Sequence, residues 1–143
     1  ITIGADEIWN LTSVEDFRTV FGECVQINQD FGFIHLSNKV YRIAWAFQGC
    51  ENITVLDLSN WDTSSVVNAG ELKQTFDRCT NLTTIYVSDK FVITPRNTMF
   101  GGCKKLVGGS GTRFVDMSDA DNSKYAKIDG GESNPGYFTL KQN

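Results

Sequence analysis

The sequence lacks the features that mark membrane-spanning and nucleic-acid-binding proteins. It contains no apolar run long enough to cross a bilayer, so no membrane insertion is expected. Its 13 basic residues are outnumbered by 17 acidic ones, which gives a net charge of −4, and they form no Lys/Arg cluster. Because a nucleic acid or an anionic membrane requires a basic surface, neither is expected to be the main partner.

Residues that carry catalysis or hold metals are also scarce. The chain has 1 histidine, His35, and its 4 cysteines include no Cys-x-x-Cys pair, so no zinc motif can be written. Alternation between Ile34 and Leu36 puts His35 on the outer face of a strand, where there is no cysteine, so a Cys-His pair is not expected. Asp57 occupies the equivalent position one repeat away, but the sequence assembles no Ser-His-Asp arrangement. The glycine-rich segment 108–111 lacks the Lys-Ser/Thr of a phosphate-binding loop. We therefore expect no enzyme activity, no catalytic residues and no cofactor.

One acidic stretch leaves a metal alternative open. It concentrates oxygen ligands of the kind that calcium prefers, at Asp116, Asp119, Asp121 and Asn122. The spacing of an EF-hand and its closing Glu are missing. We expect a solvated acidic loop that holds no metal, and bound calcium is the alternative.

Length and composition fit one ordinary globular domain. The chain has 143 residues, of which 41% are apolar and 21% charged, and its 3 Trp, 4 Tyr and 10 Phe argue against disorder. It starts at Ile1, with no Met and no segment resembling a signal peptide. We therefore expect a mature or excised fragment.

What the sequence does contain is a repeat. Four copies of Phe-x-x-Cys occur, at Phe21–Cys24, Phe47–Cys50, Phe76–Cys79 and Phe100–Cys103. The second and third are followed by apolar-x-x-apolar-x-apolar-Ser, at Ile53–Ser59 and Leu82–Ser88, and a shifted copy, Phe31–Ser37, follows the first. The cysteines are 26, 29 and 24 residues apart, a period that predicts a solenoid of stacked units.

The repeats predict an α/β fold, a short solenoid with a parallel sheet on its concave face and short helices on its convex side. Stretches such as Ile53–Leu58 and Leu82–Val87 alternate like half-buried strands, and Ile1–Ile3 is a possible first edge strand. Short helices are expected before the Phe-x-x-Cys copies, at Val14–Glu23, Val40–Phe47, Glu71–Arg78 and from Thr94 and Pro95 onwards.

After Cys103 the repeat pattern fails, and turn residues alternate with short apolar stretches. We expect a C-terminal β cap of one or two hairpins, which covers the end of the core. Its plugging residues should be Phe114, Tyr125, Ile128, Tyr137 and Phe138. The predicted organisation is a single domain, 1–143, with repeats over 1–103 and the cap over 104–143.

Stacking would align the four cysteines in one column inside the solenoid. Cysteine is small and among the most buried residue types, and neighbouring side chains in a column point the same way, which is poor geometry for a bridge. We expect four free, buried thiols that serve packing. A disulfide or a metal site is the alternative.

The second repeat carries a resemblance to a known family. It runs Ala46-Phe47-Gln48-Gly49-Cys50, then Ile53-x-x-Leu56-Asp57-Leu58-Ser59-Asn60-Trp61-Asp62-Thr63-Ser64. This resembles the BspA-like leucine-rich-repeat surface proteins of bacteria, and the likeness extends from Ala46 to Thr139. It implies a secreted or cell-surface, non-enzymatic repeat protein of a host-associated bacterium, linked to adhesion and often placed beside other modules.

The candidate binding surface is the concave face, where the x positions of the strands project. Stacking predicts three rows across the sheet: Phe33/Val55/Thr84, His35/Asp57/Tyr86 and Ser37/Ser59/Ser88. The expected binding residues are Phe33, His35, Asp57, Thr84 and Tyr86. The expected partner is a host or bacterial surface protein or glycan, bound by a monomer.

Alternatives to this function remain open. The sheet face could be merely solvated, and the domain could be a structural spacer that displays another module. From a different class, a glycan or peptide hydrolase is the remaining alternative. Trp61 follows a strand and is either an exposed anchor or a lid over the edge of the core.

Overall fold

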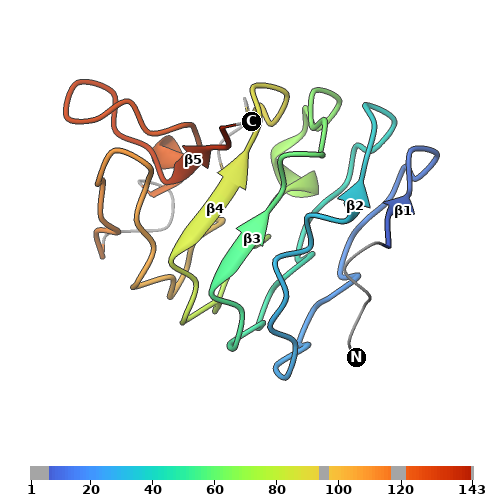
Figure 1. Ribbon diagram of the computed structural model, residues 1–143, viewed down its shortest axis with the longest axis horizontal. Coiled ribbons are helices and arrows are strands. Elements are labelled where there is room, and N and C mark those ends of the chain that lie inside the picture. Colours follow the sequence, from blue (N-terminus) through green and yellow to red (C-terminus); the bar gives the residue numbers. More distant parts are fainter. Residues whose placement is uncertain (1–6, 94–96, 117–121, 143) are drawn as a thin grey trace.

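The structure is a computed structural model that describes residues 7–93, 97–116 and 122–142. Most of the backbone is irregular, with short parallel strands side by side in chain order (Figure 1). The strands are β1 (Trp9–Asn10), β2 (Ile34–His35), β3 (Val55–Asp57), β4 (Thr84–Val87) and β5 (Phe138–Leu140). β1 pairs with β2, and β3, β4 and β5 form a second sheet in that order, with parallel pairing throughout.

The strands form where apolar residues alternate with polar ones. In β4, Ile85 and Val87 are fully buried, whereas Thr84 and Tyr86 are half-buried on the opposite face. The alternation predicted from the sequence is therefore confirmed in this strand. It places one face of the sheet on the core and leaves the other partly exposed to solvent.

The predicted helices are wrong at Val14–Glu23, Val40–Phe47 and Glu71–Arg78. The described residues contain no helix of the expected length, only the 3₁₀ turns η1 (Ala69–Glu71) and η2 (Ser123–Tyr125). The helix expected from Thr94 and Pro95, and the edge strand at Ile1–Ile3, begin outside the described residues.

Left-handed backbone explains why helices do not form in these segments. Thr19, Trp45 and Gln74 have φ of 58°, 58° and 55°, and each interrupts a right-handed helix. The segments are chains of consecutive turns whose alternate N–H groups bond the next repeat. The Phe21 N–H donates to the Ala46 carbonyl oxygen at 2.9 Å, and the Phe47 N–H to that of Thr75 at 3.0 Å. Bonds that a helix would make internally are thus made between repeats.

A column of phenylalanine rings runs through the core. Phe47 stacks on Phe76 with ring centroids 6.3 Å apart, and Phe76 stacks on Phe100 at 5.7 Å, both nearly parallel. Phe21 extends the column at 5.7 Å from Phe47. Trp61, 1% exposed, lies beside the column against Phe47, so it is part of the core and not an exposed anchor.

The cysteines form the expected column of free thiols, and no disulfide is present among them. Each later thiol donates to the carbonyl oxygen of the preceding repeat's phenylalanine: Cys50 to Phe21 at 3.0 Å, Cys79 to Phe47 at 3.1 Å and Cys103 to Phe76 at 3.0 Å. The expectation that all four are buried is wrong for Cys24, which is half-buried because it lies in the first repeat, at the end of the column.

The C-terminal segment adds a strand as well as turns. β5 pairs in parallel with β4, whereas hairpin-like antiparallel pairing is confined, in the part of the chain that the structure describes, to the bridge between Val107 and Arg113. Tyr137 and Phe138 are fully buried, and both rings pack edge-on against Phe100. The other residues expected to plug the core, Phe114, Tyr125 and Ile128, are partly buried against it.

Candidate functional site

The predicted middle row is correct for two of its three residues. Asp57 pairs with Tyr86, and Tyr86 pairs with Thr139 of β5, so the row continues toward the C-terminus. His35 does not belong to it. It pairs with Asn10 in the other sheet, and the next residue, Leu36, bridges to Trp61. The predicted row of His35, Asp57 and Tyr86 is therefore wrong at His35.

Extra residues after Cys24 cause this displacement. The Asp57 N–H donates to the Asp30 carbonyl oxygen at 2.6 Å, so Asp30 occupies the place beside Asp57 that His35 was expected to fill. Phe31 then turns into the core with φ of 63°, and β2 forms only three residues later, at Ile34. β2 is thereby shifted along β3.

The two outer rows are only partly as predicted. Phe33 precedes β2 and is partly buried, with its ring edge-on to Trp9 at 5.1 Å, whereas Tyr86 lies on β4. Thr84 pairs with Val55 as predicted. The row of serines is engaged locally, since the Ser59 hydroxyl donates to Asp57 Oδ1 at 2.6 Å. Of the five expected binding residues, the structure brings Asp57, Thr84 and Tyr86 together.

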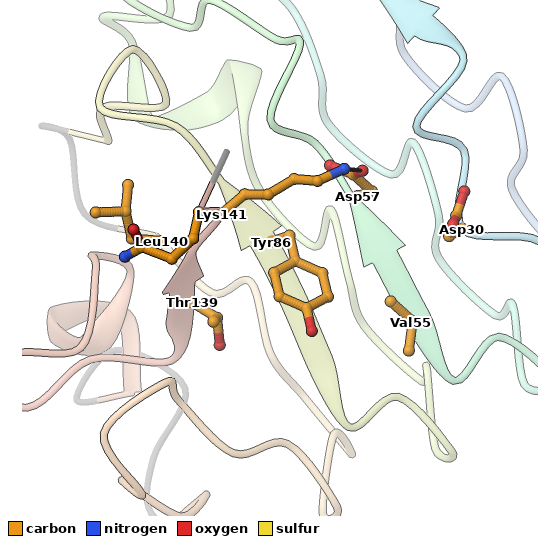
Figure 2. A pocket seen from close by; sticks show the side chains of 8 residues that line it. Asp30, Val55, Asp57, Tyr86, Thr139, Leu140 and Lys141 are labelled. Atoms are coloured by element: carbon orange, nitrogen blue, oxygen red, sulfur yellow. Dashed lines mark hydrogen bonds and ion pairs between the residues drawn. The ribbon is translucent and has the colours of Figure 1, made fainter.

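A cavity of about 500 Å³ lies on this face, around Tyr86 (Figure 2). We call it the Tyr86 groove. It is lined by Asp30, Val55, Asp57, Tyr86, Thr139, Leu140, Lys141 and Gln142. Figure 2 shows the Tyr86 ring between Val55 and Thr139, while the Lys141 side chain crosses β4 to reach Asp57. Residues from three strands and two loops therefore converge on one aromatic ring.

Asp57 is held rigidly at one side of the groove. Its side chain is buried, and Oδ1 accepts hydrogen bonds from the N–H and the hydroxyl of Ser59, at 3.1 and 2.6 Å. Oδ2 pairs with the Lys141 ammonium. Gly32 approaches so closely that a Cβ there would lie 2.8 Å from Oδ2. Only glycine fits at that position without displacing the carboxylate.

The charge of Asp57 follows from these contacts. Burial alone would raise the pKa of Asp57, but the hydrogen bonds from Lys141 and Ser59 outweigh it and lower the pKa below its ordinary value. The same contact raises the pKa of Lys141. Both groups are ionised at neutral pH, and the groove contains a fixed carboxylate.

Sequence reasoning missed Asp30, Thr139 and Lys141. The expected cap of one or two hairpins contains no parallel strand, although Phe138-Thr139-Leu140 has the same apolar-polar-apolar alternation as Leu56-Asp57-Leu58. That alternation was the available signal for β5. With β5 placed beside β4, Lys141 would have fallen next to the predicted row.

Metal-ligand clusters are absent from residues 7–93, 97–116 and 122–142. These ranges hold no group of three His, Cys, Asp or Glu side chains that could bind a metal ion. Asp119 and Asp121 of the possible calcium loop lie outside them. Over the same ranges, no helix is long and apolar enough to span a membrane.

Comparison with known proteins places most of the chain in one family. The model of a family described as "Mycoplasma protein of unknown function, DUF285" matches residues 3–112. No curated protein and no solved structure matches the chain.

Proposed function

The chain belongs to the DUF285 family, and we propose that it is a leucine-rich-repeat solenoid of the BspA-like kind that acts as a non-catalytic binding or adhesion module. The observation that carries this proposal is the Tyr86 groove, where a half-buried aromatic ring is surrounded by charged and hydroxyl groups on the open face of the sheet. Interface energy concentrates at such aromatic anchors.

The solenoid part of the proposal is supported by the bonding between repeats. Alternate N–H groups of one repeat donate to carbonyl groups of the next, as Phe76 does to Met99 at 3.0 Å. The phenylalanine and cysteine columns follow the same order. A stack of this kind offers an extended binding face on which neighbouring strands contribute to one site.

The proposed setting comes from the resemblance of the second repeat to BspA-like proteins. We infer a secreted or cell-surface location on a host-associated bacterium, and a protein or glycan partner bound by a monomer. A structural spacer is the second candidate. It is favoured only if the groove engages no ligand.

An array of glycans and extracellular-matrix proteins, probed with the labelled chain, tests this proposal. Tyr86→Ala should weaken binding to any hit by at least about tenfold, because it removes the central ring. Tyr41→Ala is the matched control, since Tyr41 is 37% exposed and lies outside the groove, with its ring beneath the Arg42 guanidinium. Equal loss in both variants, or no loss in either, would remove the groove from the binding site.

A further inference from the structure

We propose that the Tyr86 groove recognises a Lys or Arg side chain of a protein partner, and that Lys141 is an internal substitute for it that the partner displaces. This inference rests on the function proposed above and adds the chemistry of the ligand. It follows from the charge of the groove, the fixed position of Asp57 and the way in which Lys141 is attached.

The groove is lined by more negative than positive groups. Asp30 and Asp57 contribute two carboxylates, and Lys141 is the one cation among the described residues that line the groove. Asp30 is exposed, and its Oδ1 accepts a hydrogen bond from the Gly32 N–H at 3.0 Å. With a net charge of −4, the whole chain also attracts basic partners.

Asp57 keeps its orientation through contacts that do not involve Lys141. Ser59 holds Oδ1, so Oδ2 remains directed at the position that the ammonium now fills. If Lys141 leaves, a buried carboxylate loses its counter-charge, and this is unfavourable unless another cation takes its place. The site therefore selects for a positive group.

Lys141 reaches Asp57 from outside the strand. It follows the last residue of β5, Leu140, and its side chain is 43% exposed while that of Asp57 is 7% exposed. The Lys141 N–H is bonded to the Val87 carbonyl oxygen at 2.9 Å, so the backbone can stay in place while the long side chain rotates away. Lys141 is therefore the member of the ion pair that another cation can replace.

The remaining lining fits the stem of a basic side chain. Lys and Arg combine an apolar stem with a cationic head. Val55 on β3 and the Tyr86 ring on β4, which Figure 2 shows on the same side of the sheet, offer apolar surface for the stem, and the ring face attracts the cation. A neutral sugar would leave Asp57 unpaired after displacing Lys141, and an acidic ligand would be repelled by Asp30.

Calorimetry with an acetylated, amidated tetralysine peptide at low salt tests this inference on the full chain. Lys141→Ala should bind the peptide more tightly than the natural chain, because the internal competitor is gone. Lys104→Ala, which removes the same charge at an exposed position outside the groove, should bind like the natural chain. Asp57→Asn should reduce affinity by at least about tenfold.

Asp57 also holds the fold locally, so Asp30→Asn is the second test of the carboxylates. It should weaken tetralysine binding more than Asp89→Asn, a matched change at an exposed position outside the groove. Equal affinities of Lys141→Ala and Lys104→Ala would overturn the inference, as would failure of Lys141→Ala to bind tetralysine.

The two proposals fail separately in a parallel titration with chitotetraose, a neutral sugar. Suppose that the natural chain binds chitotetraose but not tetralysine, and that Tyr86→Ala abolishes binding of the sugar. The groove would then remain a binding site, but the inference that it prefers cations would be overturned. If every ligand found on the array binds Tyr86→Ala as well as the natural chain, the groove itself is not the site.

Discussion

The Cys79 thiol donates a hydrogen bond to the Phe47 carbonyl oxygen, 3.1 Å away in the preceding repeat. Cys50 and Cys103 make the same contact one repeat earlier and one repeat later. The Phe-x-x-Cys motif thus links repeats twice, since its ring stacks in one column and its thiol bonds backward in another. This explains why both residue types recur together.

Reactivity toward a thiol reagent should distinguish one cysteine from the other three. Cys24 is half-buried, whereas Cys50, Cys79 and Cys103 are fully buried. A thiol reagent should modify Cys24 in the native chain and all four after denaturation without reductant. Fewer than four reactive thiols in the denatured, unreduced chain would demonstrate a disulfide and contradict the column of free thiols.

Alkaline pH should weaken the fold through the same column. Burial raises the pKa of Cys50 and of Cys103 to about 12, from an ordinary value of 9.0. The folded state therefore favours the protonated thiol, and this stabilisation is complete below about pH 9 and is lost as pH rises toward 12. Urea unfolding between pH 8 and 11 should reveal the loss. Cys50→Ala should make the free energy of unfolding depend less steeply on pH. An unchanged slope would contradict a contribution from the Cys50 thiol.

Strands β3 and β4 could be predicted from the sequence because the alternation of apolar and polar residues reports burial, as Thr84–Val87 demonstrates, whereas β1 and β5 were not predicted. The turns that replace the expected helices could not be predicted in this way. Thr19, Trp45 and Gln74 adopt left-handed backbone without being glycine, so local preference favours a helix there, and bonds to the next repeat override it. The groove was only partly predictable, because Lys141 meets Asp57 across 84 positions of sequence.

Gly49→Ala should destabilise the chain, because glycine there serves both the backbone and an ion pair. Gly49 has φ of 76°, and a Cβ would lie 2.7 Å from Oε2 of Glu23, which pairs with Arg78 across this position. We expect a loss of about 1–2 kcal/mol in urea unfolding, mainly from left-handed strain. Gly70→Ala is the control, with nothing within 4 Å of the added Cβ. Equal stabilities of the two variants would contradict the role of Gly49.

Asp129 organises the turns of the C-terminal segment. Oδ2 accepts hydrogen bonds from the Ser110 and Thr112 N–H groups at 2.8 and 3.0 Å, and Oδ1 accepts one from the Thr112 hydroxyl at 2.7 Å. Asp129→Asn should cost about 1.5–3 kcal/mol, the usual contribution of hydrogen bonds to a charged group. Asp89→Asn, at an exposed position, should change stability by less than about 0.5 kcal/mol.

The pH dependence of Asp129 has the opposite sign to that of the thiols. Burial acts to raise the pKa of Asp129, but the hydrogen bonds from Thr112, Gly131 and Ser110 outweigh it and lower the pKa far below 3.8. Its stabilisation is present above about pH 4 and declines as pH falls further. Asp57 shifts in the same direction, so the difference in slope between the natural chain and Asp129→Asn isolates this group. Identical slopes below pH 4 would contradict the assignment.

Phe138 and Leu140 test whether the C-terminal strand belongs to the shared core. Both lie on β5, but Phe138 is fully buried and meets Phe91 edge-on at 5.2 Å, whereas Leu140 is 41% exposed. Phe138→Ala should lower the free energy of unfolding by about 3–5 kcal/mol, because its ring also packs against Phe76 and Phe100 of the phenylalanine column. Leu140→Ala should cost much less. A single unfolding transition that shifts for Phe138→Ala means that repeats and cap unfold together, whereas an unchanged midpoint would make the C-terminal segment an appendage.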